Sequence, residues 1–528
     1  MMGKTYKVFF LLFLMLFSTQ LVFGQEFNKN IIGYYTSWSV YVRDYHVPDI
    51  HADKINYINY AFANIDNVNG IIILGDPYAD IEKWYPGDSW DPDSLRGSFH
   101  RLQILKAANP HLKTLISIGG WTWSTYFSNI ALTEDSREIF AASCVDFIQE
   151  YEFDGIDIDW EYPVSGGLPT NIYRPEDKEN FTLLLAELRV QLDQAGDYLL
   201  TIAAPASSII QENLEIDQIH QYMDWINVMT YDFHGPWGDP QSDPVTNFNT
   251  PLFIASDDPL GEPYHSYFNL SAAIQGYLDA GVPAEKLNPG LAFYGRGYSG
   301  VPDVNNGLYQ TYWGPANAGT WENGVFDYWD LEQNYINING YTAYWHNEAK
   351  VPWLYNPNTQ TMISYDNPQS IEEKGNYLNS MNLGGAMFWE FSADKYAVLL
   401  NTIYETIIDT TLTSTDEYNS VDNPLQVVLY GNFPNPFNPS TTIYFETTSL
   451  RQGYAGQAEL MENMELIIYN LKGQKIKTFP INTSTHTLIN TVIWDGTDEN
   501  NKSVSSGIYF YKLKCSNYTS TKKMILMK

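Results

Sequence analysis

The stretch "DGIDIDWEYP", residues 154–163, places three aspartates and one glutamate in a segment that otherwise has the composition of a buried strand. Side chains alternate along a strand, so the acidic residues after Asp154 share one face and the apolar residues between them share the other. The acidic face consists of Asp157, Asp159 and Glu161, and the apolar face of Ile156, Ile158 and Trp160. Asp154 has the opposite parity at the start of the strand, which indicates a supporting role.

Short runs rich in Ile, Val and Tyr recur on both sides of this stretch and alternate with longer amphipathic segments, which is typical of parallel strands with crossover helices. The predicted strands are residues 31–36, 55–63, 114–120, 153–161, 198–206, 225–232, 287–295 and 384–391. Residues 136–152 and 177–196 carry apolar residues at helical spacing and are predicted helices. Eight such strands predict an α/β fold over residues 29–408, a (β/α)8 TIM barrel with insertions.

In a barrel the acidic face of this strand points inward, and reacting groups lie at the carboxyl ends of the strands. Glu161 comes last in the series and is therefore the best candidate to touch a substrate. Closely spaced carboxylates do not all ionise at low cost, so we expect a shared proton and a raised pKa in one of them. A glutamic acid that stays protonated near neutral pH is a general acid, as cleavage of a glycosidic bond requires.

Two other readings of the acidic stretch are surface carboxylates on a solvated edge strand and a calcium site. The isoleucines on the opposite face argue against the first, because they imply burial. The run lacks the glycine placement and the later ligands of a calcium-binding loop, which argues against the second. Catalysis is the preferred interpretation.

The gap between the seventh and eighth predicted strands is too long for an unstructured loop. It contains strand-like pieces at residues 324–331, 351–356 and 362–367. We expect a small α+β insertion domain over residues 297–380, standing beside the mouth of the barrel.

The chain begins with Lys4 and Lys7 before an apolar run from Val8 to Phe17, followed by small residues at a cleavage-like position before Gln25. This pattern predicts a secretory signal peptide over residues 1–24. A membrane anchor is the alternative, but the run is much shorter than the roughly 20 apolar residues that span a bilayer. We expect a secreted protein, extracellular or at the cell surface, with no membrane span.

The net charge of −33 argues against nucleic acid and anionic membrane as partners, because phosphate binding needs an excess of Lys and Arg. A neutral substrate is compatible with this charge. The two cysteines, Cys144 and Cys515, lie far apart in different predicted domains, so a disulfide between them is not expected. Neither has neighbours that suggest a metal site, and we expect neither metal nor cofactor.

Residues 426–528 carry ten Lys and Arg against seven Asp and Glu, in contrast to the acidic chain before them. The polar stretch 409–425 between the two regions is rich in Thr and Ser and is a predicted linker. The last region has short strand-like runs separated by turns, which predicts a C-terminal β-sandwich.

The acidic stretch resembles the signature of glycoside hydrolase family 18, the chitinases and their relatives, in which the fourth barrel strand carries D-x-x-D-x-D-x-E. The match keeps all four acidic positions, Asp154, Asp157, Asp159 and Glu161. The resemblance extends from Ile31 to about Asp394, through "GYYTSW" (33–38), "INYAFANI" (58–65), "SIGGW" (117–121), "MTYD" (229–232), "FYGR" (293–296) and "MFWE" (387–390). The order of these matches follows the order of the predicted strands.

The resemblance implies a retaining, substrate-assisted mechanism, in which the carbonyl oxygen of the substrate's own N-acetyl group is the nucleophile. Glu161 would be the general acid and then the base, Asp159 would orient the acetamido group, and Asp157 would share a proton with Asp159. Tyr231 would hydrogen-bond the acetamido carbonyl. The same motifs imply substrate contacts for Asp232, Met229, Tyr294, Arg296 and Trp389; by residue type alone, core packing explains Met229 and Tyr294 equally well.

Aromatic residues make up 15% of the chain, and flat rings suit the apolar faces of sugars. Four tryptophans lie just after predicted strands, where rings can line sugar subsites: Trp38, Trp121, Trp123 and Trp237. Trp160 faces the helices by parity and is expected in the core. Gly119 and Gly120 are expected to serve close packing, and His234 has no companion at metal-ligand spacing, so a substrate contact is its less favoured role.

The insertion contains "ISYDNPQSIEEK" (363–374), which looks like the closing motif of the chitinase insertion domain and favours chitin over N-glycans. The expected function is therefore a secreted chitinase that hydrolyses β-1,4 linkages between N-acetylglucosamine units. The alternatives are an endo-β-N-acetylglucosaminidase acting on glycoproteins and a non-hydrolytic chitin-binding lectin on the same fold. Glu161 disfavours the lectin, since such lectins usually lack the catalytic acid.

The C-terminal region opens with "NFPNPFNPSTTIYF" (432–445) and ends with "SGIYFYKL" (506–513) and a basic final strand. These features resemble the C-terminal sorting domain of the type IX secretion system. The resemblance implies that the type IX secretion machinery is a partner of this protein. The stretch 448–464 is longer than that pattern. A fibronectin-like spacer and a sugar-binding module are the alternatives.

Overall fold

The computed structural model describes residues 27–91, 94–408, 427–433, 437–447, 464–481, 489–500, 502–515 and 518–527. The predicted signal peptide and the predicted linker lie outside these ranges, as does nearly all of the stretch 448–464. The chain divides into two compact units, Met1–Ser414 and Thr415–Lys528.

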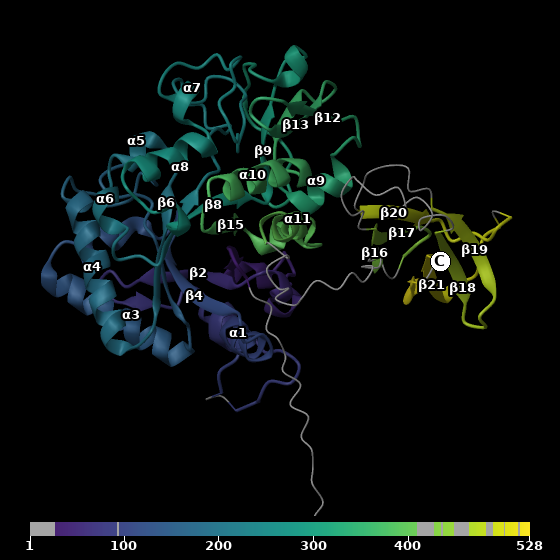
Figure 1. The fold of residues 1–528 in the computed structure, drawn as a ribbon, viewed down its shortest axis with the longest axis horizontal. Helices are drawn as coiled ribbons and strands as arrows, with labels where there is room; N and C mark the ends of the chain where they lie inside the picture. Colours follow the sequence, from purple (N-terminus) through teal and green to yellow (C-terminus); the bar gives the residue numbers. More distant parts are fainter. Residues whose placement is uncertain are drawn as a thin grey trace, which may run out of the picture. The chain divides into compact units, whose positions relative to one another are not determined.

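The first unit contains a closed barrel of parallel strands, which confirms the predicted TIM barrel (Figure 1). Its strands are β1 (Asn30–Thr36), β2 (Tyr57–Ile65), β4 (Lys113–Gly119), β5 (Gly155–Asp159), β6 (Leu199–Pro205), β7 (Trp225–Met229), β8 (Leu287–Ala292) and β15 (Gly385–Trp389). The barrel closes because β1 pairs with β2 on one side and with β15 on the other. A short strand, β3 (Ile72–Ile73), adds to β2 in antiparallel fashion.

Helices cover the outside of the strands, as Figure 1 shows for α3 and α4. The longer helices are α1 (Gly97–Ala108), α3 (Glu134–Tyr151), α4 (Asp177–Ala195), α8 (Leu270–Asp279), α10 (Pro368–Ser380) and α11 (Val398–Ile407). The shorter ones are α2 (Phe127–Ile130), α5 (Ser208–Gln211), α6 (Ile216–Ile219) and α7 (Tyr264–Tyr267). Within the described ranges, no helix has both the length and the apolar character needed to cross a membrane.

The two predicted helices are confirmed as α3 and α4, and their ends have local causes. The Thr133 side chain accepts a hydrogen bond from the Ser136 amide, which caps the first turn of α3. Asn367 caps α10 in the same way, and Pro368 fits the first helical position because it has no N–H to leave unpaired. These caps set where the crossover segments begin.

The two faces of β5 have the environments that the parity of its residues predicts. Ile156 and Ile158 are fully buried, and the ring of Trp160 stacks on Phe127 with centroids 5.4 Å apart. Trp160 is therefore a core residue, as expected. The opposite face of β5 looks into a barrel interior that also contains polar side chains, which leads to the site below.

A second sheet stands between β8 and β15 in the sequence and confirms the predicted insertion. Its strands are β9 (Tyr294–Ser299), β10 (Gly314–Pro315), β11 (Val325–Asp327), β12 (Thr342–His346), β13 (Val351–Asn356) and β14 (Thr361–Ser364). The order is β10-β9-β14-β13-β12, and β11 pairs with β9. Figure 1 places β12 and β13 away from the barrel helices α3 and α4.

Two strand predictions in this region are wrong in detail. The predicted strand 287–295 is split, because β8 ends at Ala292 and the chain then changes hydrogen-bond partners to enter β9. The predicted strand 324–331 is a strand only over β11, after which α9 (Tyr328–Asn334) begins, with Asp327 as its N-cap residue. Both runs are rich in apolar and aromatic residues up to and beyond the change, so composition did not mark it.

The second unit consists of two antiparallel sheets around one core, in agreement with the predicted β-sandwich. One sheet has the order β16-β17-β20, with β16 (Val427–Phe433), β17 (Thr441–Thr447) and β20 (Ile489–Trp494). The other has the order β19-β18-β21-β22, with β18 (Glu465–Asn470), β19 (Lys475–Pro480), β21 (Gly507–Cys515) and β22 (Tyr518–Leu526). Side chains from both sheets, such as Ile443 and Leu513, share the core.

Candidate active site

Asp157, Asp159 and Glu161, here called the acidic row, lie at the carboxyl end of β5, inside the barrel. Asp157 stands beside Ser117 of β4 and Thr201 of β6 in the sheet register, and Asp159 is level with Gly119 of β4. Glu161 follows the end of the strand. All three carboxyls are buried, and exposure increases from 0% at Asp157 to 4% at Asp159 and 9% at Glu161. The row thus leads from the barrel interior to its mouth, with Glu161 outermost.

Asp157 is held by four donors from four strands. Its Oδ2 accepts hydrogen bonds from Tyr34 Oη at 2.6 Å and Ser117 Oγ at 2.8 Å. Its Oδ1 accepts from Thr201 Oγ1 at 2.5 Å and Asn227 Nδ2 at 3.4 Å. Burial raises the pKa of Asp157, and these four donors oppose the rise because they favour the charged form. Asp157 is the fixed, hydrogen-bonded end of the row.

Asp159 and Glu161 favour their protonated forms. Burial raises the pKa of Asp159 well above its ordinary value, and the charges of Glu161 and Asp157 raise it further. Its Oδ1 is buried without a hydrogen-bond partner. Burial also raises the pKa of Glu161 to about 7, with a further contribution from Asp232, while a hydrogen bond with Tyr162 lowers it. At least one carboxyl of the row therefore keeps its proton near neutral pH. Asp159 Oδ1, which has no hydrogen-bond partner, is available to a ligand.

The backbone around Glu161 is held by two residues that the sequence analysis did not identify. The amide of Glu161 donates to Ser124 Oγ at 2.8 Å, and Ser124 in turn donates to the Gly120 carbonyl. Asn171 Nδ2 donates to the Glu161 carbonyl at 2.8 Å. These partners come from other loops, and no local pattern around Ser124 or Asn171 marks them. Ser124 and Asn171 thus fix the backbone position of Glu161 just after β5.

Gly119 brings β4 close to β5 at the same level. It has a φ of +106°, and a Cβ there would lie 2.4 Å from the carbonyl oxygen of Asp159. The next amide, that of Gly120, donates to this carbonyl at 2.8 Å. A side chain would therefore push against the backbone that carries Asp159, which agrees with the packing role expected from the sequence.

Asp154 lies at the opposite end of the strand from Glu161. Its Oδ2 accepts from the Thr114 amide at 2.7 Å and from Lys106 Nζ at 2.8 Å. These contacts tie the start of β5 to β4 and to α1. Asp154 supports the strand and does not belong to the row.

Arg296 and Asp232 form a pair beside the row. Arg296 donates from Nε to Asp232 Oδ1 at 2.8 Å and from Nη2 to Oδ2 at 2.5 Å. Asp232 has a φ of +56°, and its amide donates to Asn249 Oδ1 at 2.9 Å. The guanidinium also lies over the rings of Tyr294 at 5.1 Å and Trp237 at 5.7 Å. Because Arg296 and Tyr294 belong to β9, the insertion sheet contributes directly to this part of the site.

Aromatic rings surround the row at the mouth. Trp389, the last residue of β15, lies 5.4 Å from the Tyr34 ring, 6.4 Å from Trp38 and 5.7 Å from Phe62. Met229, Tyr231 and Trp123 pack partly buried in the same cluster. The ring of Tyr231 lies 6.2 Å from that of Tyr294. The structure thus gathers Trp389, Trp38, Tyr231, Met229 and Tyr294 around one apolar lining.

The remaining predicted tryptophans are exposed. Trp121 is 50% exposed and Trp237 is 52% exposed. Trp84 and Trp90, which the sequence analysis did not single out, stack on each other at 4.8 Å. His234 is 1% exposed, and its Nδ1 lies 3.0 Å from the Ser242 carbonyl oxygen. His234 is a structural residue of its loop, whereas the rings of Trp121 and Trp237 are accessible.

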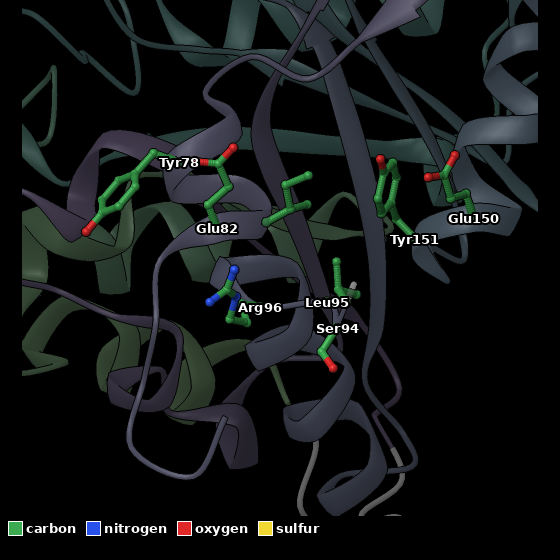
Figure 2. Close-up of a pocket in the computed structure, with 8 residues that line it drawn as sticks. Tyr78, Glu82, Ser94, Leu95, Arg96, Glu150 and Tyr151 are labelled. Atoms are coloured by element: carbon green, nitrogen blue, oxygen red, sulfur yellow. The ribbon is translucent and has the colours of Figure 1, made fainter. Parts of the chain in front are cut away.

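A separate surface pocket of about 610 Å³ is lined by side chains of the short helical segment η4 (Tyr78–Glu82), of the residues just before α1 and of the end of α3 (Figure 2). Arg96 and two glutamates, Glu82 and Glu150, give it mixed charge. It includes none of the residues of the row. Across the described ranges, no cluster of His, Cys, Asp and Glu has the arrangement of a metal site.

Comparisons with known proteins agree with this geometry. Residues 30–394 match the family described as Glycosyl hydrolases family 18. Chitinase A1 from Niallia circulans is 48% identical over 411 residues, which cover 71% of this chain and 58% of that protein. Endochitinase 1 from Metarhizium robertsii is 37% identical over 371 residues, covering 69% of this chain and 81% of that protein.

Solved structures give the same result. Chitinase ChiA74 from Bacillus thuringiensis superposes with a TM-score of 0.68 at 34% identity, covering 94% of this chain and 85% of that one. The Group IV chitinase of Ostrinia furnacalis has a TM-score of 0.63 at 33% identity, covering 72% and 99%. Residues 432–527 match a secretion system C-terminal sorting domain, which marks the protein for export to the cell surface or beyond. The chain is a glycoside hydrolase that belongs to family 18, with a C-terminal sorting domain.

Proposed function

We propose that the protein is a chitinase, which hydrolyses β-1,4 linkages between N-acetylglucosamine units. The observation that carries this proposal is Glu161, buried at the barrel mouth with a pKa of about 7, at the end of a row in which Asp159 keeps one oxygen without a partner. The names of the relatives support the choice of substrate. The chain spans 58% of the length of chitinase A1, so the proposal concerns the region that this chain and chitinase A1 share.

Glu161 protonates the glycosidic oxygen as the bond to the leaving sugar breaks. The acetamido carbonyl oxygen of the sugar that remains bonds to the anomeric carbon in the same step, which gives a cyclic oxazolinium ion. Glu161, now a carboxylate, takes a proton from a water that attacks the anomeric carbon, so the configuration is retained. Glu161 is protonated again when water has opened the ring, and the cycle closes.

Asp159 accepts a hydrogen bond from the acetamido N–H and stabilises the positive charge that develops on this group. The free Oδ1 supports this role, since a buried carboxyl oxygen without a partner is costly until substrate supplies a donor. Asp159 shares a proton with Asp157. The four hydrogen-bond donors around Asp157 support Asp157 as the more readily ionised of the two. Tyr231 donates to the acetamido carbonyl.

The sugar next to the cleaved bond stacks on Trp389, and Asp232, Met229, Tyr294 and Arg296 line the same subsite. Trp38, Trp121 and Trp237 line further subsites. We assign the catalytic domain to residues 29–408 and its insertion domain to residues 297–380, followed by the linker 409–425 and the sorting domain 426–528. The insertion forms one wall of the cleft, because Arg296 and Tyr294 reach the site from its sheet.

A cleavage assay with chitin oligosaccharides and a high-mannose glycoprotein tests the proposal. We expect the wild type to cleave the oligosaccharides and Glu161→Gln to lose at least a hundredfold in kcat. Asp80→Asn is the matched control, because Asp80 is also buried with a pKa of about 7 but lies outside the row. Cleavage of the glycoprotein alone would favour an endo-β-N-acetylglucosaminidase, and binding of chitin without cleavage would favour a lectin.

The stereochemistry is tested separately. The first product released should have the β configuration at its new reducing end, as measured by NMR or chromatography of the anomers. An α product would exclude the substrate-assisted mechanism while leaving the chitinase assignment intact.

We also propose that the C-terminal domain directs export through type IX secretion machinery, after a signal peptide at residues 1–24 has taken the chain across the inner membrane. Removal of residues 415–528 should leave active enzyme inside the cell in a host with this machinery. Equal amounts of truncated and full-length enzyme in the medium would contradict this role.

A further inference from the structure

Trp313 is the most exposed tryptophan of the catalytic unit among the described residues, at 83%. It lies in the insertion, between β9 and β10, and neither the motifs nor the proposed mechanism assigns it a role. Its amide donates to the Ser299 carbonyl at 2.8 Å, which anchors its backbone to the end of β9. An exposed indole on an anchored backbone calls for an explanation.

The indole ring of Trp313 packs against the backbone of Gly300. A Cβ at Gly300 would lie 2.2 Å from Trp313 Cδ2 and 2.4 Å from Cγ, so the indole occupies the space that any side chain would need. Gly300 has a φ of +68°, which favours glycine at this point. The ring therefore rests on the strand while most of its surface faces solvent. Such a ring binds flat ligands at a low cost in side-chain entropy, because it is already oriented.

The hairpin that carries Trp313 is attached to the loop that carries Trp237. Tyr312 Oη accepts from the Gly238 amide at 3.0 Å and donates to the Asp243 carbonyl at 2.7 Å. The two tryptophans are the sequence neighbours of Tyr312 and Gly238, so bond lengths place their Cα atoms within roughly 16 Å of each other.

Both rings also contact the chain segment formed by β9 and Gly300, the residue that follows it. The guanidinium of Arg296 lies against the Trp237 ring, and Gly300, under Trp313, is four residues further along the chain. At a strand rise of about 3.3 Å per residue, this corresponds to a step of up to roughly 13 Å along the chain from Arg296. The ring of Trp313 is thus an extension of the wall that begins at Tyr294.

The surroundings of Trp313 favour a sugar over a protein partner. Between residues 295 and 380, which the structure describes completely, the other exposed large apolar side chains are Val304 and Ile338. This is much less apolar surface than a protein interface needs. A single ring suits the apolar face of one pyranose unit.

We propose that Trp313 is a distal subsite, on which one sugar of a long N-acetylglucosamine chain stacks beyond Trp237. The inference rests on the proposed chitinase function. Substrates that end before this subsite do not touch Trp313, whereas longer chains gain the additional contact. The effect of the residue therefore depends on chain length.

The test compares wild type, Trp313→Ala and Trp313→Phe on chitin oligosaccharides of increasing length, with kcat and KM measured for each. We expect Trp313→Ala to act normally on the shortest substrates and to raise KM for the longest by about two- to tenfold, the range of a lost ring contact. Trp313→Phe should recover most of the loss. Val304→Ala, on the same hairpin and 58% exposed, is the control and should behave as wild type.

Equal KM values for wild type and Trp313→Ala at every length would overturn the proposal. A loss of the same size on short and long substrates, with a lower unfolding temperature, would also overturn it, because Trp313 would then act by holding β9. Failure of the wild type to cleave any oligosaccharide would instead refute the chitinase function itself.

Discussion

Arg296 of the insertion sheet holds Asp232 of the barrel through two parallel hydrogen bonds, of 2.8 and 2.5 Å. The carboxylate of Asp232 is also one of the causes of the raised pKa of Glu161. The guanidinium compensates part of this negative charge, since an opposite charge at hydrogen-bond distance offsets it. We therefore expect the insertion sheet, through Arg296, to influence the proton affinity of Glu161.

Changes to this pair should move the pH profile in opposite directions. In the proposed mechanism Glu161 acts as an acid below its pKa of about 7, so activity should fall as the pH rises through that value. Asp232→Asn removes a repelling charge and should shift the basic limb of kcat/KM to lower pH, by about 1 unit or less. Arg296→Gln leaves Asp232 uncompensated and should shift it upward. Shifts in the same direction would show that the pair acts on the position of Glu161 rather than on its charge.

The Tyr34 hydroxyl should matter to catalysis although it is buried in the barrel interior. It donates to Asp157 Oδ2 at 2.6 Å, and a hydrogen bond to a charged group is worth about 1.5–3 kcal/mol. Tyr34→Phe should therefore lower kcat about tenfold or more, because it makes Asp157 less readily ionised and so shifts the proton that Asp157 and Asp159 share. Tyr35→Phe is the control, because Tyr35 is equally buried but donates to the Tyr45 carbonyl. Equal kcat values in the two variants would remove Asp157 from the proton scheme.

A methyl group at Gly119 should disturb the acidic row through the backbone. The added Cβ would lie 2.4 Å from the Asp159 carbonyl oxygen, so either β4 or β5 must move. We expect Gly119→Ala to lose most of its activity and to unfold at a lower temperature. Gly87→Ala is the control for positive φ alone: Gly87 has a φ of +99° with no atom within 4 Å of the added Cβ, and the change should cost about 1 kcal/mol. Similar activities would show that the row tolerates displacement.

The ion pair of Lys374 and Asp366 should be important for stability. Both side chains are fully buried, and Lys374 Nζ lies 2.6 Å from each carboxylate oxygen. Lys374→Met leaves a buried charge without its partner and should cost about 3–5 kcal/mol in the free energy of unfolding. Lys350→Met, which breaks a partly exposed pair with Glu373, should cost less than about 1 kcal/mol. Urea unfolding followed by tryptophan fluorescence measures both, and equal costs would contradict the argument.

The barrel could be predicted because its signals are local. The strand period of two separates Ile156 and Ile158 from Asp157 and Asp159, and the structure keeps this separation. The predicted strand 287–295 was wrong because its strand-like composition continues while the hydrogen-bond partners change, from the barrel at β8 to the insertion sheet at β9. No local pattern marks the residue at which a strand leaves one sheet for another.

The order of the row and the place of Glu161 at its end could be read from the sequence, because both follow from position along a single strand. What surrounds the row depends on the tertiary structure. Tyr34, Ser117 and Thr201 reach Asp157 from three other strands, and Ser124 and Asn171 hold the backbone of Glu161 from other loops. These partners are brought together by barrel closure and loop packing, which depend on contacts between distant segments. The acid itself is a local feature of the chain, whereas its proton affinity depends on the fold.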